Sequence, residues 1–344
     1  MPKPTQQELA DLFLEFGDVC EELGSPCYGL LSRLTARNSA LLGLAAHASR
    51  PPAPNVFLAA VHYLVLNGST HPLSDRYAAL TRGSGVDESL SETFTDFCCS
   101  HAEAIKQLVA TRIVQTNEVN RSTFLAPALS VVYRESGARP LALVEIGASA
   151  GLNLFWDRYR IDYPDGGVLG DPGSELVLST EMRGTSLPPD LPQRPEIASR
   201  TGLDLSPIDI TDRDQRAWLH ALLWPDQRYR KQRLDKAIEI ATREGPPAIV
   251  RGDALLELRP LLAAASPGAA LCVYNSSVLY QFTPPQRDKL KAVLAEASAE
   301  RPLWHVSAES EEGLILNRYE ASQLVYERTL AEFDPHGRWL QWMG

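Results

Sequence analysis

The first part of the chain has the hydrophobic spacing of helices and carries no strand pattern. Large apolar residues recur at intervals of three and four between Leu9 and Phe16, and again between Phe94 and Leu108. Such intervals place side chains on one face of an α-helix. The glycine-containing stretch 81–85 predicts a turn between two of these helices. We therefore predict an all-α N-terminal domain over residues 1–135.

After residue 140, short apolar runs alternate with helical patterns. The runs with the composition of buried strands are 141–146, 197–205, 248–253, 269–274 and 303–307. This alternation predicts an α/β domain over 136–344 with a Rossmann-like, mostly parallel sheet. The turn residues Asp334–Gly337 separate two more strand patterns, which predict an antiparallel C-terminal hairpin. Strand-like pieces around a Gly/Pro-rich turn within 158–181 predict a hairpin, which is part of an insertion over about 158–195.

The stretch Ala142–Leu154 combines a predicted strand, a tight turn and a predicted helix. The strand is apolar apart from Glu145, and the turn consists of the small residues Gly147–Gly151. Such a turn lets the backbone approach a ligand and points helix N-terminal N–H groups at it. Ligands of parallel α/β sheets bind at the carboxyl ends of the strands. The residues at those predicted ends are Gly147, Asp204, Asp253, Asn275 and Ser307.

One interpretation of this turn is a serine hydrolase. The sequence around Ser149 matches the Gly-x-Ser-x-Gly nucleophile elbow, and its strand-to-helix setting fits. Asp253 and then His305 or His336 follow in the order serine, acid, histidine. Against this interpretation, only helices precede the strand, no His-Gly-Gly stretch is present, and Glu145 has no role in that mechanism.

A second interpretation is a nicotinamide or flavin site. Its fingerprint, Gly-x-Gly-x-x-Gly, needs a middle glycine that admits the pyrophosphate. Ser149 occupies that middle position, and no glycine follows Gly151 at the required spacing. The sequence therefore favours this interpretation least.

The third interpretation is a site for S-adenosylmethionine. Glu145-x-Gly147-x-x-x-Gly151 resembles the first motif of class I methyltransferases, with Ser149 where many members carry glycine. This departure from the motif is tolerable if Ser149 keeps a negative φ. The resemblance implies that Asp204 accepts hydrogen bonds from the ribose hydroxyls and that Asp253 meets the adenine amino group. The implied cofactor-binding residues are Glu145, Gly147, Ala148, Ser149, Gly151, Asn153, Asp204, Gly252, Asp253 and Asn275.

Several short stretches together resemble one bacterial family of unknown function, domain-of-unknown-function family 2332. They are Val114–Glu118, Glu145–Asn153, Trp156–Tyr159, Trp224–Asp226, Arg251–Ala254 and Asp334–Gly337. The family is generally placed near the methyltransferase fold and has no assigned reaction. The resemblance implies a methyltransferase-type sheet and says little about the substrate.

The segment 111–121 is dense in side chains that form hydrogen bonds. It fits either a helix cap with a solvated face or a polar wall over the site, in which arginine holds a carboxylate. The resemblance favours the second possibility. The candidate substrate-binding residues are Gln115, Asn117, Arg121, Ser276 and Tyr280. The candidate general bases are His305, on the fifth strand, and Glu118, although a lone strand histidine is more often a core residue.

Composition narrows the class of protein and its partners. The net charge of −10 opposes general binding to nucleic acid or anionic lipid. The sequence contains no run of about 18 apolar residues, so we expect no membrane span. We also find no hydrophobic signal core at the N-terminus. Five scattered cysteines fit neither a disulfide framework nor a zinc site, so we expect a reduced, cytoplasmic protein without a metal.

These observations predict S-adenosylmethionine-dependent methylation of an unidentified small molecule. One alternative is a non-catalytic module that keeps the fold and binds a metabolite or a partner. The unusual turn at 147–151 and the lack of an Asn/Asp-Pro-Pro-Tyr sequence at 275–278 favour that alternative. The serine hydrolase based on Ser149 is the second alternative.

Overall fold

The computed structural model describes residues 4–80, 86–164 and 167–343, so the turn predicted at 81–85 lies outside it. The chain forms two compact units. The helical unit comprises Met1–Thr116 and Asp212–Gln232, and the sheet unit comprises Asn117–Thr211 and Arg233–Gly344. Each unit therefore contains two separate stretches of the chain, and the predicted domain boundary at 135/136 lies inside the sheet unit.

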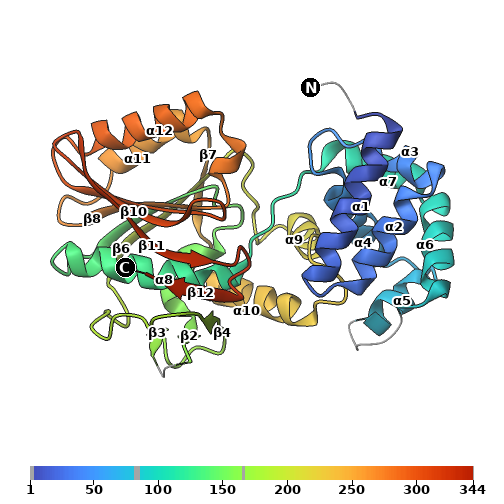
Figure 1. Cartoon of the computed structure of the whole chain (residues 1–344), viewed down its shortest axis with the longest axis horizontal. Coiled ribbons are helices and arrows are strands. Elements are labelled where there is room, and N and C mark those ends of the chain that lie inside the picture. Colours follow the sequence, from blue (N-terminus) through green and yellow to red (C-terminus); the bar gives the residue numbers. More distant parts are fainter. Residues whose placement is uncertain (1–3, 81–85, 165–166, 344) are drawn as a thin grey trace. The chain divides into compact units, whose positions relative to one another are not determined.

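Figure 1 shows the helices that make up the helical unit. They are α1 (Gln6–Glu22), α2 (Pro26–Ala36), α3 (Ser39–Ala45), α4 (Ala53–Leu66), α5 (Leu73–Leu80), α6 (Glu88–Ser100), α7 (Ala102–Thr111), α9 (Arg213–Ala221) and the first residues of α10 (Arg228–Glu244). The sequence fixes several helix starts locally. Thr5 and Glu8 form a capping box at α1, and Asp87 caps α6 by accepting the Leu90 N–H.

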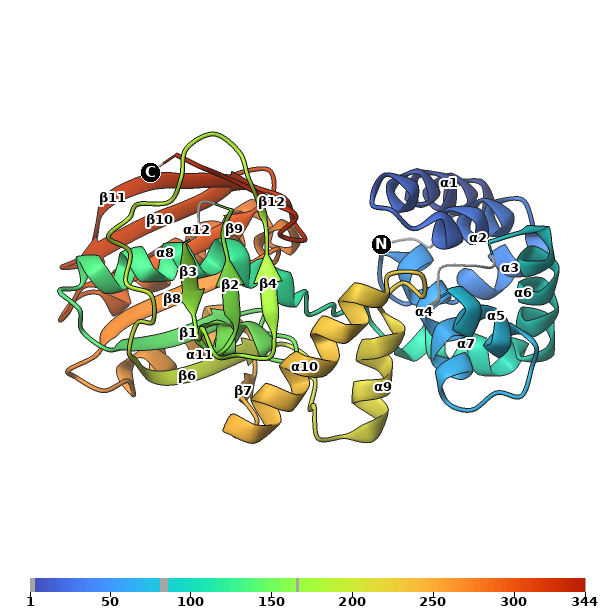
Figure 2. The same ribbon diagram turned by 90° about the horizontal axis from the view of Figure 1, so that it is seen from below.

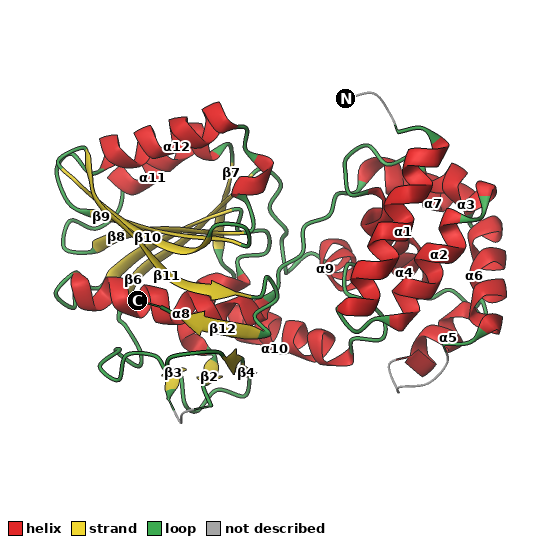
Figure 3. Cartoon of the chain, viewed as in Figure 1, coloured by secondary structure: helices red, strands yellow, loops and turns green. Residues whose placement is uncertain are grey.

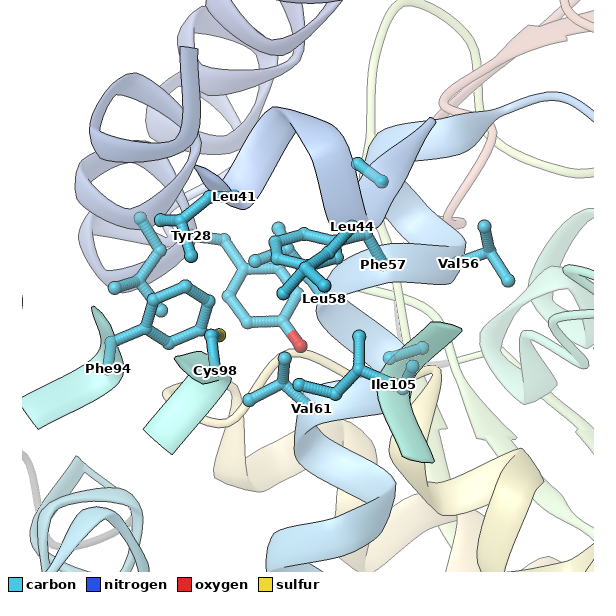
Figure 4. Packing of buried hydrophobic residues seen from close by; sticks show 14 of the residues in the cluster. Tyr28, Leu41, Leu44, Val56, Phe57, Leu58, Val61, Phe94, Cys98 and Ile105 are labelled. Atoms are coloured by element: carbon cyan, nitrogen blue, oxygen red, sulfur yellow. The ribbon is translucent and has the colours of Figure 1, made fainter. Parts of the chain in front are cut away.

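The core of the helical unit is a continuous apolar cluster. Phe57 of α4 lies edge-to-face with Phe13 and with Phe94, at ring separations of 5.9 and 6.2 Å. Tyr28 lies in the middle of the cluster, close to Leu58 (Figure 4). Its hydroxyl is buried and has no hydrogen-bond partner among the residues that the structure describes.

We expect Tyr28→Phe to raise the free energy of unfolding by about 1 kcal/mol, because it removes a buried hydroxyl that makes no hydrogen bond. Tyr159→Phe is the matched control. The Tyr159 hydroxyl donates to the Leu152 carbonyl over 2.6 Å, so its removal should destabilise the protein by about 1 kcal/mol. Urea unfolding of both variants measures the difference. Equal destabilisation by the two changes would contradict the assignment.

The sheet unit is organised around one nine-stranded sheet, in the order β5-β12-β11-β10-β9-β8-β1-β6-β7. Its parallel strands are β1 (Leu141–Ile146), β6 (Ile197–Asp204), β7 (Ala248–Arg251), β8 (Ala270–Ser276) and β9 (Leu303–Glu309). The strands β10 (Gly313–Glu320), β11 (Gln323–Phe333) and β12 (Trp339–Trp342) continue it antiparallel, and the short β5 (Glu181–Met182) pairs with β12. The predicted α/β fold and its C-terminal hairpin are confirmed, and β10 is an additional strand.

Helices cover both faces of this sheet (Figures 1 and 3). Helices α11 (Ala254–Ala263) and α12 (Pro284–Ala297) pack on the face that carries Val144 and Ile146. Because side chains alternate along a strand, Glu145 points to the opposite face, where α8 (Ser122–Glu135) packs. Helix α8 is buried throughout Ser122–Val132, as expected of a helix enclosed in a core.

The insertion forms a separate small sheet, visible in Figure 2. It contains β2 (Arg160–Asp162), β3 (Val168–Gly170) and β4 (Val177–Ser179) in the order β3-β2-β4. The predicted hairpin of the first and last of these strands is wrong, because β2 and β4 run parallel. Strand β3 pairs antiparallel with one edge of β2, and β4 pairs with the other edge.

Candidate functional site

The bend after β1 is a tight loop of positive-φ residues. Gly147 and Gly151 have φ of 71° and 68°, and a Cβ on Gly147 would lie 2.2 Å from Val278 Cγ2. Ser149 has a φ of 52°, so the negative φ under which a serine at this position would fit the first methyltransferase motif is not found. Two hydrogen bonds hold Ser149 in this conformation. Its N–H donates to Asp204 Oδ2 over 2.8 Å, and its carbonyl accepts the Ile208 N–H over 3.0 Å.

The backbone amides of the bend are largely used within the protein. The Gly147 N–H donates to the Leu203 carbonyl (2.8 Å), and the Gly151 N–H donates to the Ala148 carbonyl (2.7 Å). The Leu152 N–H donates to Asn117 Oδ1 over 3.0 Å. The helix that follows, η2 (Leu152–Arg158), is a 3-10 helix of seven residues. The expected array of free N–H groups is therefore absent at these amides, which disfavours a bound diphosphate.

Two carboxylates lie at the ends of the next two strands. Asp204 ends β6, and its second oxygen accepts the Ser206 N–H over 2.8 Å. The Asp204 carbonyl accepts the Gly252 N–H (3.0 Å), which ties the end of β6 to the end of β7. Asp253 then caps α11 by accepting the Leu255 N–H. The structure thus brings the bend, Asp204, Gly252 and Asp253 to one edge of the sheet.

Glu145 is a buried acid beside the bend, on the α8 face. Burial raises the pKa of Glu145 to about 8 and the negative charge of Asp204 adds to this effect, while Tyr274 and the Arg121 cation act against it. The Tyr274 hydroxyl donates to Glu145 Oε2 over 3.3 Å. The Glu145 carboxyl group is therefore mostly protonated at pH 7.

Asn275 and His305 form a buried pair on the other face of the sheet. The His305 Nε2 donates to Asn275 Oδ1 over 2.8 Å, and Asn275 Nδ2 donates to Ser307 Oγ and Glu309 Oε1. Burial lowers the pKa of His305 to about 4, which keeps the ring neutral at physiological pH. His305 lies in the middle of β9 rather than at its carboxyl end, so the geometry does not favour it as a general base.

The polar segment before α8 joins three parts of the sheet unit. Asn117 holds the start of η2, and Arg121 donates to the carbonyls of Ser276 (3.0 Å) and Pro335 (3.1 Å). Asn120 donates through its side chain to the Gly337 carbonyl over 2.8 Å. Glu118 is buried and accepts the Asn120 N–H over 3.2 Å. Glu118 is thus the N-cap of the short 3-10 helix η1 (Val119–Arg121), while Asn117, Asn120 and Arg121 bond to other parts of the sheet unit.

The remaining candidates differ in their surroundings. Ser276 Oγ is buried and has no hydrogen-bond partner within the described parts of the chain, whereas Tyr280 is 68% exposed. Asn153 Oδ1 accepts a hydrogen bond from the Ser122 hydroxyl over 3.3 Å. Ala148 packs closely on Gly202, and Gln115 belongs to the helical unit.

Glu309 and the role of Asn120 were not predicted from the sequence. Glu309 is the last residue of β9, two residues beyond the predicted strand 303–307, and a longer predicted strand would have placed an acid at its carboxyl end. The contacts of Asn120 had no such signal, because its partners are on Ser179 and on the turn 334–337, far away in sequence.

Within residues 4–80, 86–164 and 167–343, no group of three or more histidine, cysteine or acidic side chains could hold a metal ion. No helix in this part of the chain combines the length and the apolar composition needed to cross a bilayer. All five cysteines are free thiols, and four of them are buried.

The five parallel strands lie in the order β7-β6-β1-β8-β9, so the first of them along the chain, β1, is central and the strand order reverses beside it. This order defines a doubly wound α/β protein. The chain belongs to the family described as "uncharacterized protein conserved in bacteria (DUF2332)", whose model matches residues 10–342. No curated protein and no solved structure matches the chain.

Proposed function

We propose that the protein is an S-adenosylmethionine-dependent methyltransferase that acts on a small molecule. The observation that carries the proposal is the hydrogen bond between the Asp204 carboxylate and the Ser149 N–H at the bend. In doubly wound sheets, ligands bind where the strand order reverses, which in this protein is between β1 and β8. The bend, Asp204 at the end of β6 and Asp253 just after β7 follow the carboxyl ends of three neighbouring parallel strands.

The donor set of this edge suits a nucleoside better than a nucleotide. Carboxylates accept hydrogen bonds from ribose hydroxyls and from an amino group, and they repel phosphates. Neighbouring strands are about 4.8 Å apart, so acids at the end of β6 and just after β7 could meet the sugar and the base of one ligand. Asp204 would hold the ribose and Asp253 the adenine, with the backbone of Gly147 against the ligand.

Bound S-adenosylmethionine supplies an electrophilic methyl group. The chain's own residues would mainly orient the acceptor and exclude water. Arg121, Ser276 and Tyr280 lie at or just after the carboxyl end of β8 and are the proposed contacts of the acceptor, with Asn117 holding the bend. Glu118 is the proposed base for the acceptor's proton, and the role of Gln115 stays a prediction.

The first test separates ligand binding by the Asp253 carboxylate from the role of Asp253 as the cap of α11. Serine caps helices about as well as aspartate, so Asp253→Ser should keep α11 intact. We expect S-adenosylhomocysteine to bind the wild type with micromolar affinity in calorimetry and Asp253→Ser about tenfold more weakly, because a hydrogen bond to a charged group is lost. Asp87→Ser, the same change at the cap of α6, is the matched control and should bind normally. Wild type that binds neither S-adenosylhomocysteine nor S-adenosylmethionine would contradict the proposal.

One observation favours the hydrolase as a second candidate. Ser149 has positive φ within Gly-x-Ser-x-Gly, and a sharp, strained turn is a feature of nucleophile elbows. Labelling by a fluorophosphonate that disappears in Ser149→Ala would favour the hydrolase over the methyltransferase. A non-catalytic module would bind the nucleoside and transfer no methyl group to any acceptor.

A further inference from the structure

Glu309, at the end of β9, accepts hydrogen bonds from three N–H groups on a single carboxylate oxygen. Its Oε1 accepts the Val278 N–H and the Leu279 N–H, each over 2.9 Å, and the Asn275 side-chain amide over 2.8 Å. Glu309 is buried, as is Asn275. A buried carboxylate with this many donors is held in one position, and it holds its donors in turn.

We infer that Glu309 is a positioning residue that fixes the loop after β8 against the bend after β1. The inference deepens the proposed function, on which its ligand-binding part rests. Glu309 does not touch the ligand in this account. It acts through Val278, which forms the contact between the two loops.

The loop after β8 has a conformation that its sequence alone does not favour. Ser277 has a φ of 54° although it is not glycine, and its N–H donates to the Ala308 carbonyl over 2.9 Å. A non-glycine residue in this region persists only where its surroundings hold it. The bonds from Val278 and Leu279 to Glu309 directly follow Ser277 and supply that restraint.

The restrained loop defines how closely Val278 approaches the bend. A Cβ built on Gly147 would lie within 3.2 Å of three Val278 side-chain atoms, so the two residues are in close contact. At the last residue of β8, the Ser276 carbonyl accepts a hydrogen bond from Arg121. The position of this loop therefore affects both the bend and the proposed acceptor contacts.

Asn275 and His305 extend the restraint into the sheet. The Asn275 oxygen can only accept, so His305 Nε2 carries the proton, and the Asn275 amide is thereby turned toward Glu309. Since both side chains are committed to this network, we assign them a positioning role as well.

The test compares Glu309→Ala, Glu309→Gln and the exposed control Glu320→Gln. Hydrogen exchange read by mass spectrometry on peptides covering 275–282 reports the loop, and calorimetry with S-adenosylhomocysteine reports the ligand site. We expect Glu309→Ala to exchange faster in this peptide and to bind about tenfold more weakly, since at least one buried hydrogen bond to a charged group is lost. Glu309→Gln keeps an acceptor oxygen and should lie between Glu309→Ala and wild type, and Glu320→Gln should match wild type.

The outcomes separate the inference from the proposed function. Unchanged exchange at 275–282 in Glu309→Ala overturns the inference, as does faster exchange with unchanged affinity. A wild type that does not bind the nucleoside contradicts the proposed function itself. If Glu309→Ala fails to fold, Glu309→Gln decides the question by the same two measurements.

Discussion

Gly147→Ala is expected to destabilise the protein by about 3 kcal/mol or more and to abolish nucleoside binding. Two effects add at this position. Gly147 has a φ of 71°, where a Cβ costs about 1–2 kcal/mol. The new methyl group would also lie 2.2 Å from Val278 Cγ2, and such overpacking typically costs about 1–3 kcal/mol.

The two effects can be separated by a matched control and a double variant. Gly137 has a φ of 75° and open space around its Cβ position, so Gly137→Ala should show only the conformational effect. Val278→Ala removes the two Val278 methyl groups in the clash and should partly restore stability in combination with Gly147→Ala. Urea unfolding measures the stability, and titration with S-adenosylhomocysteine the binding, of wild type, Gly147→Ala, Gly137→Ala and the double variant. If Gly147→Ala and Gly137→Ala were equally stable, the close contact of the two loops would be refuted.

Glu145→Gln is expected to stabilise the protein at neutral and alkaline pH. The folded-state pKa of Glu145 is raised to about 8 from an ordinary value of 4.5, mainly by burial. Between these values the folded state binds more protons than the unfolded state, so stability falls as pH rises from 4.5 to 8. At about 1.4 kcal/mol for each pH unit, wild type loses about 5 kcal/mol over this interval through this residue. Glutamine is neutral at every pH and does not incur this loss.

The measurement is the free energy of unfolding of wild type and Glu145→Gln between pH 5 and pH 9. We expect the two curves to lie close together at pH 5 and to separate by about 3 kcal/mol or more at pH 8. Glu320→Gln, at an exposed position, should follow wild type throughout. Parallel curves for wild type and Glu145→Gln would show that Glu145 is ionised in the folded protein.

The sequence predicted the parallel strands because their burial leaves a direct mark on composition. Strands such as β1 and β8 are buried at every residue and read as apolar runs. The strand β10 was missed because Asn317 and Arg318 interrupt its apolar run, and its identity depends on pairing with β9 and β11. The position of α8 on the sheet was also not evident, since its composition resembles that of the preceding helices.

Residues of the candidate site could be predicted from the sequence only where an acid stands at the carboxyl end of a predicted strand. Asp204 and Asp253 could be found in this way, and the structure places both at the edge that carries the bend. The positive φ of Ser149 could not be predicted, because it depends on Asp204, 55 residues away in sequence. The same holds for Glu309 and Val278, which are joined by tertiary contact across 31 residues.

The most direct test of the account is a crystal structure of the protein with S-adenosylhomocysteine. We predict the nucleoside at the bend 147–151, with the ribose hydroxyls about 3 Å from the Asp204 carboxylate and the adenine amino group at Asp253. A nucleoside bound elsewhere in the molecule, with Asp204 and Asp253 contacting none of it, would contradict the account.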